Sequence, residues 1–230
     1  MRLELRFVKR ALLTLGVCAV LCPAAQAFDP TGIFIGGNAG VAQFDANHNL
    51  YEDALIGSVA GNGTLVFPDD SLTRRKAAWR FDTGYMLNAN VGVIASYLNF
   101  GESNNIATGT YAPPAGTTEA VTATTRIRSR GPAVGVLLRL PLTDNLDVNF
   151  RLADYYAKTI LTNTLNAASY QSTHETKNGS SALAGLGAAY TMFGHWSAHL
   201  DYIRVQHAGD SATVGSYNLD LLTVGLSYTF

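Results

Sequence analysis

Residues 217–230 read YNLDLLTVGLSYTF, a stretch in which large apolar side chains alternate with small or polar ones. One face carries Leu222, Val224, Leu226, Tyr228 and Phe230, and the other carries Thr223, Gly225, Ser227 and Thr229. Successive side chains of a β-strand point to opposite faces, so this period of two predicts a strand with one apolar and one small or polar face. The length of the alternation exceeds that of an ordinary strand in a globular protein.

Seven upstream segments repeat the alternation and, with 217–230, predict eight strands: 32–44, 78–85, 90–101, 134–140, 146–153, 184–191 and 196–202. Short connections at 86–90, 141–145 and 193–195 contain the Pro, Gly, Asn and Asp that tight turns require. Long polar connections are expected at 45–74, 102–122, 160–179 and 207–216. Because short and long connections alternate, we expect an antiparallel up-and-down meander with all its short turns at one end.

The composition narrows the class of protein. The chain has 230 residues, of which 47% are hydrophobic and 14% charged, with a net charge of −1. The charged fraction is well below the roughly 25% of soluble domains. The high apolar content argues against a disordered chain, and the net charge near zero argues against a basic nucleic-acid-binding surface. No stretch after residue 27 approaches the 18 consecutive apolar residues of a membrane helix.

The first 27 residues have the pattern of a secretory signal peptide. Four basic residues precede an apolar run from Ala11 to Leu21, and an A-x-A sequence ends at Ala27. That run is too short to cross a hydrocarbon layer of about 30 Å as a helix, which argues against a membrane anchor. Leu21 is larger than the residue that precedes the lipidated cysteine of bacterial lipoproteins, which argues against lipidation of Cys22. We therefore expect cleavage after Ala27 and a barrel domain at 28–230.

Glycine marks the face of the strands that points inward. The small or polar face holds seven glycines that a water-exposed surface would not need: Gly36, Gly40, Gly84, Gly135, Gly185, Gly187 and Gly225. The crowded interior of a small closed barrel does need them. The apolar face is then outermost, where lipid requires it. Strands of about 9–11 residues, an even strand number and short turns at one rim are typical of transmembrane β-barrels, whose closure leaves no unpaired edge.

Aromatic side chains support this orientation. Five of them fall on the apolar face near the short turns, as expected of an aromatic girdle at a membrane boundary: Tyr85, Tyr190, Trp196, Tyr228 and Phe230. Candidates for the opposite ring are Trp79, Tyr97, Tyr156 and Tyr202.

Three segments carry a resemblance to a known family. Residues 84–101 are similar to the second hairpin of OmpA-like outer-membrane β-barrels, and 196–202 and 220–230 resemble the last two strands of that family. The resemblance implies an eight-stranded barrel in the outer membrane of a Gram-negative bacterium, with Phe230 as the terminal aromatic residue read by the barrel-assembly machinery. The chain departs from the family in two ways: Ile94 stands where the family often has an inward glutamate, and no peptidoglycan-binding domain follows Phe230.

The inward face carries a balanced set of charges. If the small or polar face of each strand points inward, the predicted polar network of the lumen comprises Arg80, Asp82, Arg139, Asp147, Arg151, His199 and Asp201. Unpaired charges would be very costly in a low-dielectric interior. Arg139 and Asp147 are equally far from Thr143 across a hairpin, so we expect an ion pair. Eight strands leave room for side chains only, which predicts a plugged lumen. The alternative is a narrow ion or solute channel.

The motifs that suggest enzymes are weak, and we expect no catalytic residue, cofactor or metal. Ser197, His199 and Asp201 share a strand face, but a lipid-modifying serine enzyme of this type works on the lipid side, and this face points inward. His195 and His199 lie roughly 13 Å apart along a strand, too far to share a metal ion. The acidic pair Asp69–Asp70 could serve as the paired acids of an outer-membrane protease, but it is more simply explained as two solvated residues of a loop.

Two basic clusters are predicted just above the outer leaflet, where lipopolysaccharide phosphates lie: Arg74, Arg75 and Lys76, and Arg126, Arg128 and Arg130. The alternative is that these are solvated charges on strand extensions. Long polar loops are also where a surface ligand would bind. The sequence therefore predicts an envelope-structural or surface-interaction role, with a small-solute channel and a lipid-modifying enzyme as alternatives.

Overall fold

The computed structural model describes residues 31–45, 64–112, 117–166, 172–208 and 217–230. They form nine β-strands, each antiparallel to its partners: β1 (Gly32–Asp45), β2 (Thr64–Thr73), β3 (Arg75–Met86), β4 (Val91–Ala112), β5 (Glu119–Pro141), β6 (Leu146–Leu165), β7 (Thr173–Met192), β8 (Trp196–Ala208) and β9 (Tyr217–Thr229). No helix among the described residues is long and apolar enough to cross a membrane.

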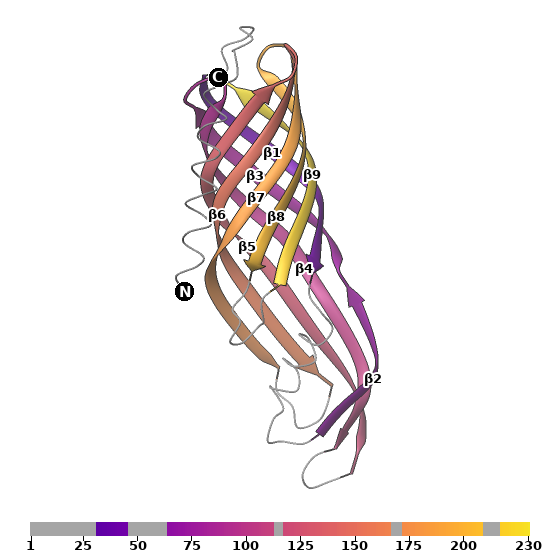
Figure 1. Cartoon of the computed structure of the whole chain (residues 1–230). Coiled ribbons are helices and arrows are strands. Elements are labelled where there is room, and N and C mark those ends of the chain that lie inside the picture. Colours follow the sequence, from indigo (N-terminus) through magenta and orange to yellow (C-terminus); the bar gives the residue numbers. More distant parts are fainter. Residues whose placement is uncertain (1–30, 46–63, 113–116, 167–171, 209–216) are drawn as a thin grey trace, which may run out of the picture.

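The sheet closes into a barrel (Figure 1). Its strands follow the order β4-β3-β1-β9-β8-β7-β6-β5, and β4 also pairs with β5, so the ring has no edge. β2 continues β3 across Arg74 and pairs with the distal half of β4, so the two segments occupy one position in the ring. The predicted eight-stranded antiparallel barrel is thereby confirmed.

Short polar side chains shape the tight turns at one end. The Asn88 side-chain oxygen accepts hydrogen bonds from the backbone N–H groups of Asn90 and Val91, each at 2.8 Å. Thr143 does the same for Leu146 at 3.1 Å in the next turn. In the third turn Phe193 and Gly194 both adopt positive φ angles, 50° and 76°, which glycine tolerates without strain. These turns lie where the sequence predicted them.

The predicted strand ends at the other rim are wrong. β4, β5, β6 and β7 contain 22, 23, 20 and 20 residues, so most of 102–122 and part of 160–179 are strand rather than loop. β2 likewise occupies part of the predicted connection 45–74. The physical reason is that alternation continues with smaller side chains. In β5, Val121, Ala123 and Thr125 are buried between exposed or half-buried neighbours, and pairing with β4 and β6 extends along these residues.

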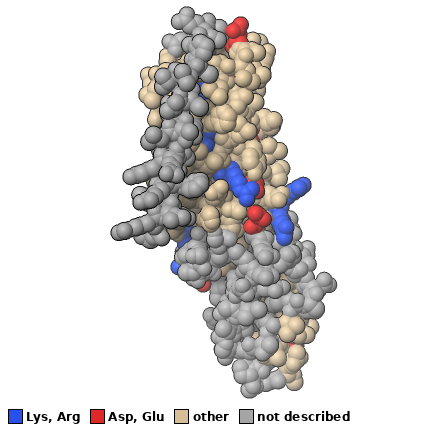
Figure 2. All heavy atoms as spheres, in the orientation of Figure 1, with Lys and Arg blue, Asp and Glu red and all other residues tan. Residues whose placement is uncertain are grey.

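The predicted orientation of the strands holds. Leu222, Val224 and Leu226 are 54%, 62% and 50% exposed, whereas Thr223 between them is buried. Figure 2 shows the result on one face: a band nearly free of charge beside the short turns, with basic and acidic side chains gathered farther along the molecule. An apolar exterior around a partly charged interior is the arrangement that lipid requires and bulk water disfavours.

Candidate functional site: the lumen and the outer wall

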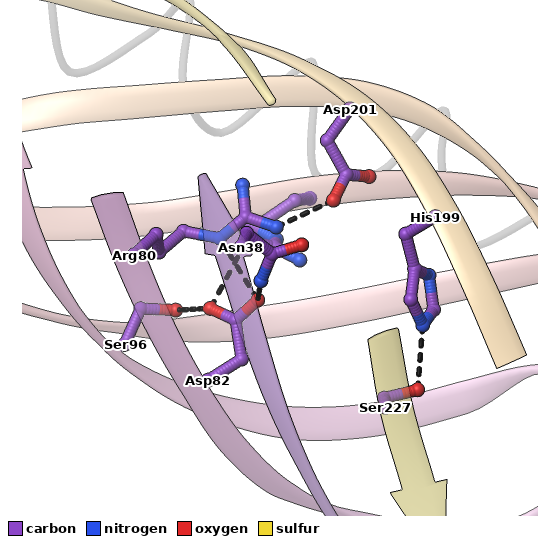
Figure 3. A network of polar contacts seen from close by, with 8 residues as sticks. Asn38, Arg80, Asp82, Ser96, His199, Asp201 and Ser227 are labelled. Carbon is purple, nitrogen blue, oxygen red and sulfur yellow. Dashed lines mark hydrogen bonds and ion pairs between the residues drawn. The ribbon is translucent and has the colours of Figure 1, made fainter. Parts of the chain in front are cut away.

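Arg80 is the centre of the polar network in the lumen (Figure 3). It lies on β3 with 1% of its surface exposed. Its Nε donates to Asp82 Oδ2 at 2.8 Å, and its Nη2 pairs within the lumen with Asp201 on β8, a strand separated from β3 by β1 and β9. One guanidinium therefore joins carboxylates of two strands that are not neighbours in the ring, through charge-assisted contacts that are stronger than neutral hydrogen bonds.

Asp82 collects further donors from three strands. Ser96 Oγ donates to Asp82 Oδ1 at 2.6 Å, Asn38 Nδ2 donates to Oδ2 at 3.0 Å, and Arg151 Nη1 lies 3.4 Å from Oδ1. Two arginines and two aspartates thus balance within one cluster. Such compensation is what a buried charge requires, since removal of one partner exposes the full desolvation cost of the other.

Arg139 and Asp147 form a separate pair toward the short turns. Arg139 Nε lies 3.7 Å from Asp147 Oδ2, within ion-pair distance and longer than a hydrogen bond. The two side chains remain 11% and 13% exposed. All seven residues of the predicted network therefore lie in the lumen, but they divide into the Arg80 cluster, this pair and His199.

Apolar layers lie on both sides of the polar network. On the short-turn side Phe34, Met86, Ile94 and Leu137 form one cluster. Ile94, the residue that departs from the family pattern, is part of it. A larger cluster fills the other half of the lumen, and its members include Phe44, Leu98, Phe100, Ile127, Tyr155, Tyr217, Leu219 and Leu221. Sequence reasoning missed these layers. The sequence contains evidence for these layers, because Leu219 and Leu221 fall on the same strand face as the inward Thr223.

The free space beside the network is small. A cavity of about 20 Å³ is bounded by side chains that include Asn38, Asp82, Arg139, Asn149 and His199. Space of this size holds about one water molecule. Small-molecule sites usually measure 300–1,000 Å³, so this cavity has no room for a substrate.

His199 does not contact the serine that sequence reasoning paired with it. Its Nε2 lies 2.5 Å from Ser227 Oγ on β9, whereas Ser197 Oγ lies 3.2 Å from Thr191 Oγ1. The signal for the correct partner is the β8–β9 register, which sets His199 opposite Gly225 and so brings Ser227 within diagonal reach. Both residues face the small cavity. Among the described residues no group of three His, Cys, Asp or Glu side chains could hold a metal ion.

The predicted girdle residues lie on the outer wall. Tyr228 contacts two of them edge to face, with ring centroids 5.2 Å from Trp196 and 5.0 Å from Phe230. Tyr85 and Tyr190 are 46% and 51% exposed on other strands. The candidates for the opposite ring also face outward: Trp79, Tyr97, Tyr156 and Tyr202.

The two basic clusters differ in their surroundings. Arg74 and Arg75 are exposed, but Lys76 is half-buried and shares its parity with the inward Arg80. In the second cluster Glu102 pairs with Arg128 at 2.8 Å and with Arg126 at 3.8 Å. Arg130 forms no ion pair within the described part of the chain. Asp69 and Asp70 lie in β2, and their side chains are outside the described part.

Comparison of the sequence with known proteins finds a family that matches nearly the whole chain. The sequence profile described as OmpA-like transmembrane domain matches residues 29–230. Outer membrane protein A of Serratia marcescens is 31% identical over 105 residues, which cover 45% of this chain and 29% of that protein. The same protein of Serratia odorifera is 34% identical over 95 residues, covering 40% and 38%. The matched part is thus well under half the length of either relative.

Solved structures share the fold, and Neisserial surface protein A is an example. Neisserial surface protein A superposes with a TM-score of 0.50 at 10% sequence identity, over 87% of this chain and 98% of that one.

Proposed function

The chain belongs to the OmpA-like transmembrane domain family and resides in the outer membrane of a Gram-negative bacterium, and on this basis we propose that it is a non-enzymatic barrel with a closed lumen. Its role in this proposal is envelope-structural, or to present a surface for interaction. The long strands β4–β7 carry that surface beyond the rest of the ring.

The filled lumen is the observation that carries this proposal. Ion pairs and hydrogen bonds of the Arg80 cluster link β1, β3, β4, β6 and β8, and packed apolar side chains lie on either side of the cluster. A solute would have to break buried ion pairs and displace a close-packed core to pass, and each step costs several kcal/mol.

Planar-bilayer conductance tests the closed lumen. We expect the purified barrel to give no stable openings across the range of voltages at which the bilayer itself is intact. Stable, reproducible openings would refute the closed lumen and favour the narrow-channel alternative.

The non-enzymatic part of the proposal rests on the position of the serine–histidine pair. His199 and Ser227 meet inside the barrel beside a cavity of about 20 Å³, away from the lipid face on which a lipid-modifying enzyme would act. Mass spectrometry of lipid A from cells with and without the protein checks this. An identical lipid A is expected, whereas a change that disappears in His199→Ala, Ser197→Ala or Ser227→Ala would establish an enzyme.

Three further partnerships belong to the proposal. Outer-leaflet lipopolysaccharide would meet the basic side chains of the outer wall, and a surface ligand would meet the segments that join the long strands. The barrel-assembly machinery would read Phe230, whose backbone N–H donates to the carbonyl of Ile33 at 2.9 Å across the β1–β9 seam. Residues 1–27 would be removed during export.

A further inference from the structure

A groove crosses the outer wall of the barrel over β4, β5, β6 and β7. It measures about 720 Å³, and its lining includes the side chains of Tyr97, Arg130, Pro132, Tyr156, Lys158 and Asn178. This volume is in the range of sites that hold organic ligands. The groove lies on the face opposite the lumen, so it is separate from the Arg80 cluster.

The rim of the groove farther from the short turns is a row of polar residues on four neighbouring strands. The register places Asn99 opposite Arg130, Arg130 opposite Lys158, and Lys158 opposite Asn178. Two cations therefore stand directly across from each other on paired strands. Like charges in this position repel and destabilise the pair unless an anion lies between them.

No carboxylate of the described residues compensates these two cations. Their neighbours Arg126 and Arg128 share Glu102, at 3.8 and 2.8 Å, but neither Arg130 nor Lys158 forms an ion pair in the described part of the chain. Asp154, on the same outer face of β6, accepts a hydrogen bond from Ser180 Oγ at 2.6 Å. The charge of the groove is thus net positive at its rim.

Aromatic residues form the adjacent row, one step nearer the short turns. Tyr97 lies opposite Pro132, and Tyr156 lies opposite Ser180. Tyr97 also stacks on Trp79 with ring centroids 5.7 Å apart. Farther in the same direction the outer wall becomes aliphatic, with Val134 and Leu152 58% and 46% exposed. Cations, then tyrosines, then aliphatic side chains follow the order of a lipid's phosphate, interface and acyl chains.

We propose that this groove is a specific site for a phosphorylated glycolipid of the outer leaflet, the lipid A part of lipopolysaccharide. The phosphate lies between Arg130 and Lys158, the sugar lies against Tyr97 and Tyr156, and the acyl chains continue along Val134 and Leu152. The site rests on the proposed lipid contact of the outer wall. It assigns that contact to Arg130 with Lys158, because Arg126 and Arg128 already share Glu102.

Binding of lipid A to the full barrel in neutral detergent micelles tests the site. The probes are bisphosphorylated lipid A and lipid A from which both phosphates have been removed. We expect the double variant Arg130→Gln/Lys158→Gln to bind the phosphorylated probe at least tenfold more weakly than the unchanged protein, as the loss of charge-assisted hydrogen bonds predicts. The unchanged protein should also prefer the phosphorylated probe by a similar factor.

Two matched variants define the control. Arg126→Gln/Arg128→Gln removes the same charge from the neighbouring rows, and Lys158→Arg keeps the charge in the groove, so both should bind within about threefold of the unchanged protein. Equal loss in both double variants would indicate general attraction to anions and overturn the site. So would equal binding of the two probes, or equal competition by phosphatidylglycerol. Heat-modifiable gel mobility verifies that each variant is folded.

The conductance measurement separates this inference from the proposed function. A barrel that conducts but binds phosphorylated lipid A through Arg130 and Lys158 would refute the closed lumen alone. A barrel that is closed but shows no preference for the phosphorylated probe would refute the groove alone.

Discussion

Arg80 stabilises the barrel because its buried guanidinium is shared by two carboxylates, of which only Asp82 also pairs with Arg151. We expect Arg80→Met to leave Asp82 and Asp201 with insufficient positive charge and to lower the free energy of unfolding by about 3–5 kcal/mol. Urea unfolding in lipid vesicles, followed by tryptophan fluorescence, measures the change.

Arg128→Gln is the matched control, since it removes an arginine from an exposed pair. Its loss should be no more than about 1 kcal/mol, the usual value of a surface ion pair. Similar losses in the two variants would show that burial of Arg80 contributes nothing.

Gly40 is required because neighbouring backbone occupies the space of a side chain. A Cβ atom there would lie 1.9 Å from the carbonyl oxygen of Leu222 on β9, and backbone cannot move aside cheaply. We predict that Gly40→Ala destabilises the barrel by about 1–3 kcal/mol, the usual cost of overpacking. Gly37→Ala on the same strand meets nothing within 4 Å and should be tolerated. Equal unfolding midpoints for the two variants would contradict the close approach.

Some individual contacts could be predicted from the sequence and others could not. The Arg139–Asp147 pair could be predicted because one tight hairpin holds its two strands together. The expected register about Thr143 is wrong, however, since Arg139 lies opposite Asn149 and reaches Asp147 diagonally. The Arg80–Asp201 pair joins strands far apart in the chain, and it depends on closure and on the stagger of the ring. The alternation of side chains along each strand predicts that both residues point into the lumen, but it does not predict that they contact each other.

The extension of β4 beyond the predicted strand makes two neighbouring residues differ. Ile106 is 47% exposed and Ala107 is fully buried, although both lie in the stretch expected to be a loop. In a chain lacking Cys18 and Cys22, a membrane-impermeant maleimide should label Ile106→Cys rapidly on intact cells and Ala107→Cys at least tenfold more slowly. Equal labelling would favour a loop over a strand.

Strand ends were the least predictable elements because two environments follow one another along each long strand. Beside lipid the outward residues are large and apolar, which makes the alternation plain. Farther on, the outward residues become Thr, Arg and Asn, and inward ones such as Ala107, Ala123 and Ser129 are small. The period of two persists there, but the hydrophobic contrast that reveals it is weak.

Lipid contact makes the outer wall intolerant of charge. Val224→Lys places an ammonium at an aliphatic site of the outer wall and should cost up to about 2–4 kcal/mol in vesicles, depending on depth. Ile106→Lys, at a similarly exposed site on the extension, should cost less than about 1 kcal/mol. The difference in urea unfolding free energy between the two variants measures the effect. A loss at Val224 no larger than at Ile106 would contradict the orientation of the barrel.

The closed ring and its orientation could be predicted because many strands repeat the same weak signal. Alternation, the side on which glycine falls and the order of short and long connections all agree, and each is local in the chain. The layers within the lumen required the stagger that brings Leu219 on β9 beside Phe44 on β1, and no local pattern contains that register.

The unequal strand lengths determine which part of this protein is accessible to large molecules from outside the cell. β5 has 23 residues and, at about 3.3 Å per residue, a contour of about 75 Å, more than twice the hydrocarbon thickness of about 30 Å. Even with a tilt of about 40° its far end stands tens of ångströms above the acyl chains. A molecule that approaches from outside the cell and is too bulky to reach the membrane surface would therefore first meet the far ends of β4–β7.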